Sequence, residues 1–137
     1  MSLLTLHLLG SPVLRQRSPE VEAFDAELKK FIDELYETME AAKGVGLAAN
    51  QVGVARRVAV VDAEGQRFAM VNPRIVRAEG KSTAEEGCLS IPDVYGDVTR
   101  PASVTLEAFD RDGNPFRLEA AGLVARAIQH EIDHLDG

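Results

Sequence analysis

Apolar residues between positions 26 and 43 recur with the spacing of a single helical face. They step along the chain by three, one, three and four residues, which is typical of an amphipathic α-helix packed on a core. Asp25 can cap the start of this helix. We predict that it runs to about Lys43, which would lie in its last turn, and that Gly44 ends it. The residues of the stripe are Leu28, Phe31, Ile32, Leu35 and Met39.

The middle of the chain changes to short apolar runs separated by turn residues, which predicts β-strands. Glu64 and Gly65 separate two such runs and predict a hairpin, and Asp112 and Gly113 predict a second turn. A short apolar pair at residues 75–76 follows Pro73. The longer runs are residues 58–61, 68–71, 104–109 and 116–118.

Residues 123–129 are apolar on nearly every face, which indicates a buried helix. We expect this helix to run through the middle of the protein between sheets. The predicted fold class is α+β: antiparallel or mixed β-sheets packed around a central buried helix, with an N-terminal amphipathic helix. No repeat or linker divides the sequence, so we expect residues 1–137 to form a single domain.

Composition and charge exclude some classes of function and indicate a cellular compartment. The 137 residues carry a formal net charge of −7, which argues against DNA binding and against adsorption to anionic membranes. A single Cys excludes an internal disulfide and fits a reducing compartment. The apolar start, residues 1–10, is too short for a signal peptide or a membrane span. We therefore expect a cytoplasmic protein.

The helix predicted at the C-terminal end continues into His130-Glu131-x-x-His134. Residues four apart lie on one helical face, so both imidazoles can bind one divalent metal, with Glu131 beside a water held by that metal. Cys88 is a natural third ligand as a thiolate. His134 lies in the final turn, whose carbonyls have no partner within the helix. We expect that turn to fray unless a bound metal holds it.

Three glycines lie within residues 44–53, and their spacing fits neither a phosphate-binding loop nor a dinucleotide-binding loop. Such glycines let the backbone pass close to a ligand or another strand. Gln51 ends this small, apolar stretch. From the local sequence alone, its amide is either a functional group or a solvated loop side chain.

These segments resemble the three signature motifs of the peptide deformylase family. Residues 44–51 (GVGLAANQ) are similar to the family's Gly-x-Gly-Leu-Ala-Ala-x-Gln, residues 86–90 match Glu-Gly-Cys-Leu-Ser, and residues 129–134 match Gln-His-Glu-x-Asp-His. Asn50 occupies the variable place of the first motif. The resemblance implies a hydrolase that removes the N-formyl group from the N-terminal methionine of nascent polypeptides and releases formate.

The resemblance also implies roles for individual residues. Glu131 transfers protons as general acid and base, while the Gln51 amide and the Leu89 backbone N–H stabilise the oxyanion. We expect Glu86 to pair with Arg100 as a support for the Cys88 loop. The implied metal ligands are Cys88, His130 and His134. The implied substrate-binding residues are Val45, Gly46, Leu47, Gly87 and Leu89.

The resemblance further implies one divalent metal, ferrous iron in the cell, with zinc, nickel or cobalt able to replace it. The expected partner is a nascent formyl-methionyl peptide. A transient contact with the ribosome is compatible with such a substrate, and we expect a monomer.

Two other functions remain open at this point. A zincin-like metalloprotease shares the His-Glu-x-x-His pentad but takes its third ligand downstream, where Asp136 is the only candidate. A non-catalytic deformylase-like module that binds peptides would be expected to lack Glu131 or Gln51, and both are present. Family members generally continue beyond the last motif, whereas this chain stops three residues after His134, as a naturally short or a trimmed member.

Overall fold

A computed structural model describes residues 17–88 and 91–137. Every pairing between the described strands is antiparallel. They form a five-stranded sheet in the order β1-β2-β3-β6-β7 and a separate β4-β5 pair. The predicted α+β class is confirmed. The elements are α1 (Ala26–Ala41), β1 (Gly46–Ala48), the 3-10 helix η2 (Ala49–Val52), β2 (Val58–Ala63), β3 (Gln66–Glu79), β4 (Ser82–Cys88), β5 (Ile91–Arg100), β6 (Ser103–Phe109), β7 (Pro115–Ala121) and α2 (Gly122–Asp136).

Helix α1 begins where the sequence predicts. The Asp25 carboxylate accepts a hydrogen bond from the backbone N–H of Leu28 at 2.9 Å, which satisfies one of the free donors of the first turn. The predicted apolar stripe is buried. The amphipathic pattern therefore places α1 as expected, with its apolar face on the sheet.

The end of α1 differs from the prediction. The helix stops at Ala41, and Lys43 lies beyond it in the left-handed region with a φ of 58°. The Gly44 N–H donates to the Met39 carbonyl at 2.9 Å, and the Lys43 N–H donates to the Glu40 carbonyl at 3.1 Å. This pair of bonds is a Schellman motif in which Lys43, not Gly44, takes the left-handed position. Lys43 is thus not part of the last turn.

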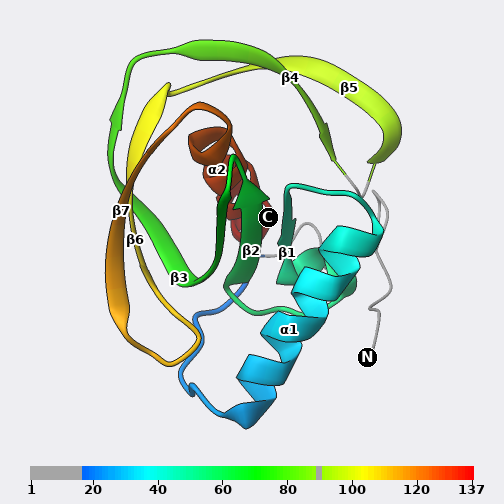
Figure 1. The fold of residues 1–137 in the computed structure, drawn as a ribbon, viewed down its shortest axis with the longest axis vertical. Helices are drawn as coiled ribbons and strands as arrows, with labels where there is room; N and C mark the ends of the chain where they lie inside the picture. Colours follow the sequence, from blue (N-terminus) through cyan, green and yellow to red (C-terminus); the bar gives the residue numbers. More distant parts are fainter. Residues whose placement is uncertain (1–16, 89–90) are drawn as a thin grey trace.

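The predicted hairpin between β2 and β3 is confirmed, with Glu64 and Gly65 both at positive φ in its turn. Strand β3 is longer than the apolar runs suggest, because it continues through Pro73. The register shifts between Val71 and Arg74, and Asn72 has a φ of 51°. Before this irregularity β3 pairs with β2, and after it β3 pairs with β6. The irregularity lets β3 pair with β2 along its first part and with β6 along its second part, as the sheet curls (Figure 1).

Strand β2 is buried on both faces and separates two cores. Val58 and Val60 belong to the cluster built around α1, whereas Ala59 and Val61 belong to the cluster built around α2. The two helices therefore lie on opposite faces of the β1-β2-β3 part of the sheet. In Figure 1, α2 lies behind β2, inside the curl of the sheet, and α1 lies to the right of β2, in front of η2.

Helix α2 occupies the predicted position between the sheets. Strands β4 and β5 arch over it (Figure 1), and the Arg126 guanidinium reaches both strands through the carbonyls of Val98 at 2.9 Å and Ser82 at 2.8 Å. The helix is not buried all round, because Leu123 is exposed. Neither described helix has the length and apolar character needed to cross a membrane.

Protein groups hold both ends of α2. The Glu64 carboxylate accepts from the Leu123 N–H at 3.3 Å at the start of the helix. At the other end, the Leu135 carbonyl accepts from the Ser18 N–H at 2.7 Å and from Arg57 Nη1 at 3.1 Å. These bonds give the final turn protein partners that the sequence did not indicate, and whether it also needs a metal stays a prediction.

The capping of α1 gives a testable stability difference. We predict that Asp25→Ala lowers the free energy of unfolding by about 1 kcal/mol, because a donor of the first turn loses its partner. Urea denaturation measures this change. Asp25→Ser keeps a capping oxygen and should stay close to wild type, and an equal loss in both variants would contradict the capping role.

Candidate active site

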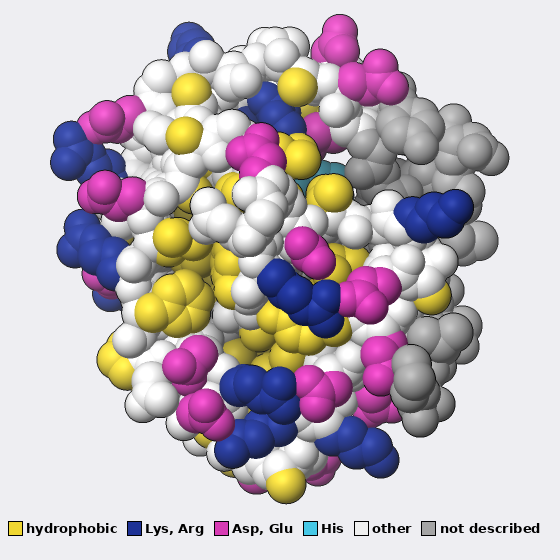
Figure 2. Space-filling model, in the orientation of Figure 1, with side chains coloured by type: hydrophobic (Ala, Val, Ile, Leu, Met, Phe, Trp, Pro, Cys, Tyr) yellow, Lys and Arg dark blue, Asp and Glu magenta, His cyan; other side chains and the backbone are white. Residues whose placement is uncertain are grey.

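The two histidines of α2 converge on one point. His130 Nε2 and His134 Nε2 are 3.2 Å apart, and the ring centroids are separated by 4.9 Å. The ligand atoms of His130, Glu131 and His134 all lie within 4.8 Å of one another. Two imidazole nitrogens and a carboxylate at this spacing suit a divalent transition metal. Figure 2 shows histidine at the floor of a recess beside the residues drawn in grey.

Glu86 of β4 fixes the orientation of His130. One Glu86 carboxylate oxygen lies 3.1 Å from His130 Nδ1. A carboxylate partner makes Nδ1 the protonated nitrogen and leaves Nε2 as the ligand, which is the usual arrangement around metal-binding histidines.

The same carboxylate joins α2 to the β4-β5 pair. Arg100 binds both Glu86 oxygens, at 2.8 and 2.9 Å, as predicted, and Arg126 also donates to one of them. Burial raises the pKa of Glu86, but the hydrogen bonds from Arg100, Arg126 and His130 outweigh it and lower that pKa to about 2. Glu86 is therefore a charged support for the site, and Arg126 is a partner that the sequence did not indicate.

His134 is in a state that favours metal binding. Burial, followed by the neighbouring His130, lowers the pKa of His134 to about 4. The ring is therefore neutral near pH 7, and a neutral imidazole is the form that ligates a metal.

Glu131 is a buried carboxyl beside the two histidines, on the side of β1. Its side chain is almost fully buried, and its Oε1 has no hydrogen-bond partner within the described residues. Burial raises the pKa of Glu131 to about 8. A carboxyl whose pKa lies near neutrality is suited to exchange protons.

Gly46 of β1 makes room for this carboxyl. A Cβ atom at position 46 would lie 3.0 Å from both Cγ and Cδ of Glu131 and still closer to its Oε2. Only glycine therefore lets strand β1 pass this close to the acid. A close backbone approach at a glycine was expected toward a ligand or another strand; at Gly46 the neighbour is instead the Glu131 side chain of α2.

Gln51 and Asn50 are both buried in η2. Gln51 Oε1 accepts from the Ala48 N–H at 2.9 Å, so its amide nitrogen is the end that carries hydrogens to donate. Asn50 Nδ2 donates to the backbone carbonyl of His134. The motif pattern predicts no role for Asn50, which occupies the variable place of the first motif. The available signal was a polar residue next to Gln51 within an apolar run.

The structure describes the remaining predicted residues unevenly. Cys88 is the last residue of β4, opposite Ile91 of β5. The structure does not describe the side chain of Cys88 or the exposure of Gly87. Leu89 lies outside the described residues. Val45 is exposed, whereas the Leu47 side chain is fully buried in the core around α1. Leu47 can therefore contact a ligand near α2 only through its backbone.

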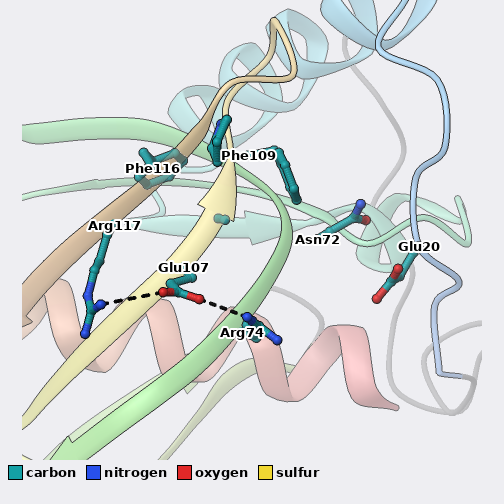
Figure 3. A pocket seen from close by; sticks show the side chains of 9 residues that line it. Glu20, Asn72, Arg74, Glu107, Phe109, Phe116 and Arg117 are labelled. Carbon is teal, nitrogen blue, oxygen red and sulfur yellow. Dashed lines mark hydrogen bonds and ion pairs between the residues drawn. The ribbon is translucent and has the colours of Figure 1, made fainter.

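A groove with a volume of about 540 Å³ lies elsewhere on the sheet (Figure 3). It contains none of the predicted site residues. Three of its charged groups pair with each other, because Glu107 binds Arg74 at 3.0 Å and Arg117 at 3.7 Å. The groove is therefore not the candidate active site.

Comparison with known proteins identifies the family. A family model described as polypeptide deformylase matches residues 3–137. The chain belongs to the polypeptide deformylase family. It is 49% identical to a peptide deformylase of Caldicellulosiruptor bescii, covering 100% of this chain and 82% of the relative. It is 52% identical to peptide deformylase 1 of Bacillus subtilis, covering 91% of this chain and 79% of the relative.

Solved structures of deformylases have the same fold. The enzyme from Thermotoga maritima gives a TM-score of 0.96 at 38% identity, covering 98% of this chain and 92% of that one. The enzyme from Synechococcus elongatus, in complex with actinonin, gives a TM-score of 0.93 at 48% identity, covering 96% of this chain and 73% of that one.

The deformylase is a metal-dependent hydrolase that removes the N-formyl group from nascent peptides, as predicted. The two alternatives are not favoured. For the metalloprotease there is also a structural reason, because the Asp136 carboxylate binds Arg57 at 2.9 Å and Arg57 is buried. The downstream ligand of a zincin is thus engaged with another partner.

The close packing of Gly46 against Glu131 predicts the effect of one added methyl group. Gly46→Ala should displace the Glu131 carboxyl and lower the rate of formate release about 100-fold, because small misplacements of a reacting group are costly. The metal content should not change. Gly96→Ala is the matched control, because a Cβ there meets no atom of the described residues within 4 Å. Equal activity in the two variants would contradict the steric argument.

The raised pKa of Glu131 predicts how the stability of the metal-free protein depends on pH. Between about pH 4.5 and 8 the folded state keeps a proton that the unfolded state has lost, so raising the pH favours unfolding. This group should reduce stability by about 1.4 kcal/mol per pH unit in that window.

Glu131→Gln removes that titration. Its stability relative to wild type should therefore rise from pH 5 to pH 8, as measured by urea denaturation with chelator present. Glu22→Gln, on the exposed arm, is the control. A constant difference between Glu131→Gln and wild type would show that burial does not raise this pKa.

Proposed function

We propose that this deformylase works with one divalent metal held by Cys88, His130 and His134, with Glu131 as the proton carrier. The observation that carries the proposal is the convergence of two imidazole Nε2 atoms, 3.2 Å apart, beside a buried carboxyl. The Glu86 carboxylate, 3.1 Å from His130 Nδ1, supports the proposal because it holds the His130 ring with Nε2 directed at the same point as His134 Nε2.

Strand β4 supports Cys88 as the third ligand. Glu86 lies two residues before Cys88 on this strand and contacts His130, so the strand ends close to the histidine pair. One thiolate and two neutral imidazoles make a donor set suited to a tetrahedral site with one open position. Ferrous iron is our proposed metal in the cell, with zinc, nickel or cobalt able to replace it.

The ion would supply positive charge that polarises the formyl carbonyl and favours the ionised form of Glu131. Glu131 then accepts a proton from the attacking water and delivers it to the amine as the carbon–nitrogen bond breaks, which leaves formate and a free N-terminus. The Gln51 amide donates to the oxyanion, together with the Leu89 backbone N–H. Each such donor contributes about 3 kcal/mol.

Substrate selection follows from the size of the formyl group. Its carbonyl carries only hydrogen, so a narrow space beside Glu131 and Gln51 admits formyl and excludes acetyl. We propose that Val45, Gly46, Leu47, Gly87 and Leu89 bind the peptide. We also propose that actinonin, which is bound to the Synechococcus elongatus enzyme, binds this chain.

The cellular setting follows from this substrate. We propose that residues 1–137 form one catalytic domain that acts as a monomer in the cytoplasm on nascent formyl-methionyl peptides, with transient contact with the ribosome. The net charge of −7 supports a role without direct DNA or membrane binding.

The decisive experiment measures formate release from a formyl-Met-Ala peptide by protein prepared without oxygen. Wild type should release formate from this peptide and none of the corresponding acid from acetyl-Met-Ala. Glu131→Gln should keep its metal and lose most of the activity, because Gln cannot accept the proton. Near wild-type turnover in this variant would overturn the proposed role of Glu131.

Metal analysis tests the ligand set separately from activity. Cys88→Ser should purify with much less metal than wild type, since a hydroxyl is a poor replacement for a thiolate. Ser90→Ala changes a nearby residue without removing a proposed ligand and should retain the metal. An unchanged metal content in Cys88→Ser would eliminate Cys88 as a ligand.

A further inference from the structure

Asn50 links the two parts of the active site through one side-chain hydrogen bond. Its side chain is fully buried, and its Nδ2 donates to the carbonyl of His134, 84 residues away in the sequence. Its Oδ1 has no partner within the described part of the chain. A buried amide that is only half satisfied costs stability. Stability alone therefore does not account for an asparagine at this position.

The hydrogen bond from Asn50 contacts the backbone of His134, whereas other residues bind the rest of the helix end. The next carbonyl, that of Leu135, is already bound by Ser18 and Arg57. These contacts do not involve Asn50, so we expect them to keep α2 in place when Asn50 is changed. The His134 carbonyl also accepts from the Gly137 N–H at 3.2 Å, a bond within the helix end, so the contribution specific to Asn50 is the link from the backbone unit of the second histidine to the element that carries Gln51.

The other end of the link is the 3-10 helix that carries Gln51. Asn50 and Gln51 are adjacent, and the Gln51 side chain is fixed by its bond to the Ala48 N–H. A hydrogen bond from Asn50 to His134 thus joins the element that presents Gln51 to the element that presents the histidines.

We propose that Asn50 is a positioning residue that sets the distance between the His134 imidazole and the Gln51 amide. This inference rests on the proposed function, in which His134 binds the metal and Gln51 donates to the oxyanion. Loss of the bond would let His134 and the turn around Gln51 shift relative to each other. Supporting groups of this kind typically change metal affinity or activity about 10- to 100-fold.

The test uses cobalt as the probe. Asn50→Leu has a similar volume and no polar atoms. It should bind Co²⁺ about 10- to 100-fold more weakly in competition with a chelator, and the absorption spectrum of the bound Co²⁺ should change. Its melting temperature should remain near that of wild type, because the unpartnered Oδ1 is removed together with the donor. The kcat of the cobalt enzyme should fall more than KM changes.

Asn72→Asp is the matched control, because Asn72 also uses its side-chain amide to hold a backbone, that of Val21. It should lower stability without changing Co²⁺ affinity or the spectrum. If Asn50→Leu does not fold, Asn50→Ser is judged by the same criteria.

His134→Ala separates this inference from the proposed function. Weak Co²⁺ binding in His134→Ala together with wild-type affinity and spectrum in the Asn50 variant would overturn the positioning role alone. Unchanged Co²⁺ binding in His134→Ala would overturn the metal site and the positioning role together.

Discussion

A buried carboxylate, that of Glu86, holds the site together. It lies on β4 and accepts two hydrogen bonds from the Arg100 guanidinium of β5. It also binds Arg126 and His130 of α2. Burying a charge is costly unless it is fully paired, so this arrangement is stable only when the β4-β5 pair sits on α2 in one orientation. The contact that fixes the strands therefore also fixes the imidazole, and the geometry of the site follows from the packing of the fold.

Two glutamates near the same histidines are placed in opposite environments. Glu86 accepts hydrogen bonds from Arg100, Arg126 and His130, and its pKa falls to about 2. Glu131 is buried against β1 with one oxygen unpartnered in the described structure, and its pKa rises to about 8. Such a separation assigns different tasks to chemically identical groups. Glu86 can hold the His130 ring in place because its carboxylate stays charged. Glu131 can exchange a proton because its pKa lies near neutrality.

The sequence predicted the elements whose signals are local. The stripe of α1, the turn at Glu64 and Gly65 and the apolar character of α2 depend on neighbours a few residues away. The local sequence did not predict that β3 continues through Asn72. Asn72 adopts its left-handed conformation with its side chain bound to the backbone of Val21, 51 residues away in the sequence. A break in an apolar pattern indicates an irregularity but not whether the strand ends there.

In the site, too, features set by nearby residues could be predicted, whereas contacts between residues far apart in the sequence could not. The spacing of His130 and His134 is a helical repeat and could be predicted, and the motifs indicated Glu131. Asn50 and Arg126 are visible only as polar residues within apolar runs, and their partners lie 84 and 40 residues away. A buried polar residue must find a partner, so such exceptions mark positions where two distant elements are joined. In this deformylase both exceptions join an element to α2, the helix that carries both histidines, and so they fix where the histidine pair lies relative to Gln51 and to strand β4.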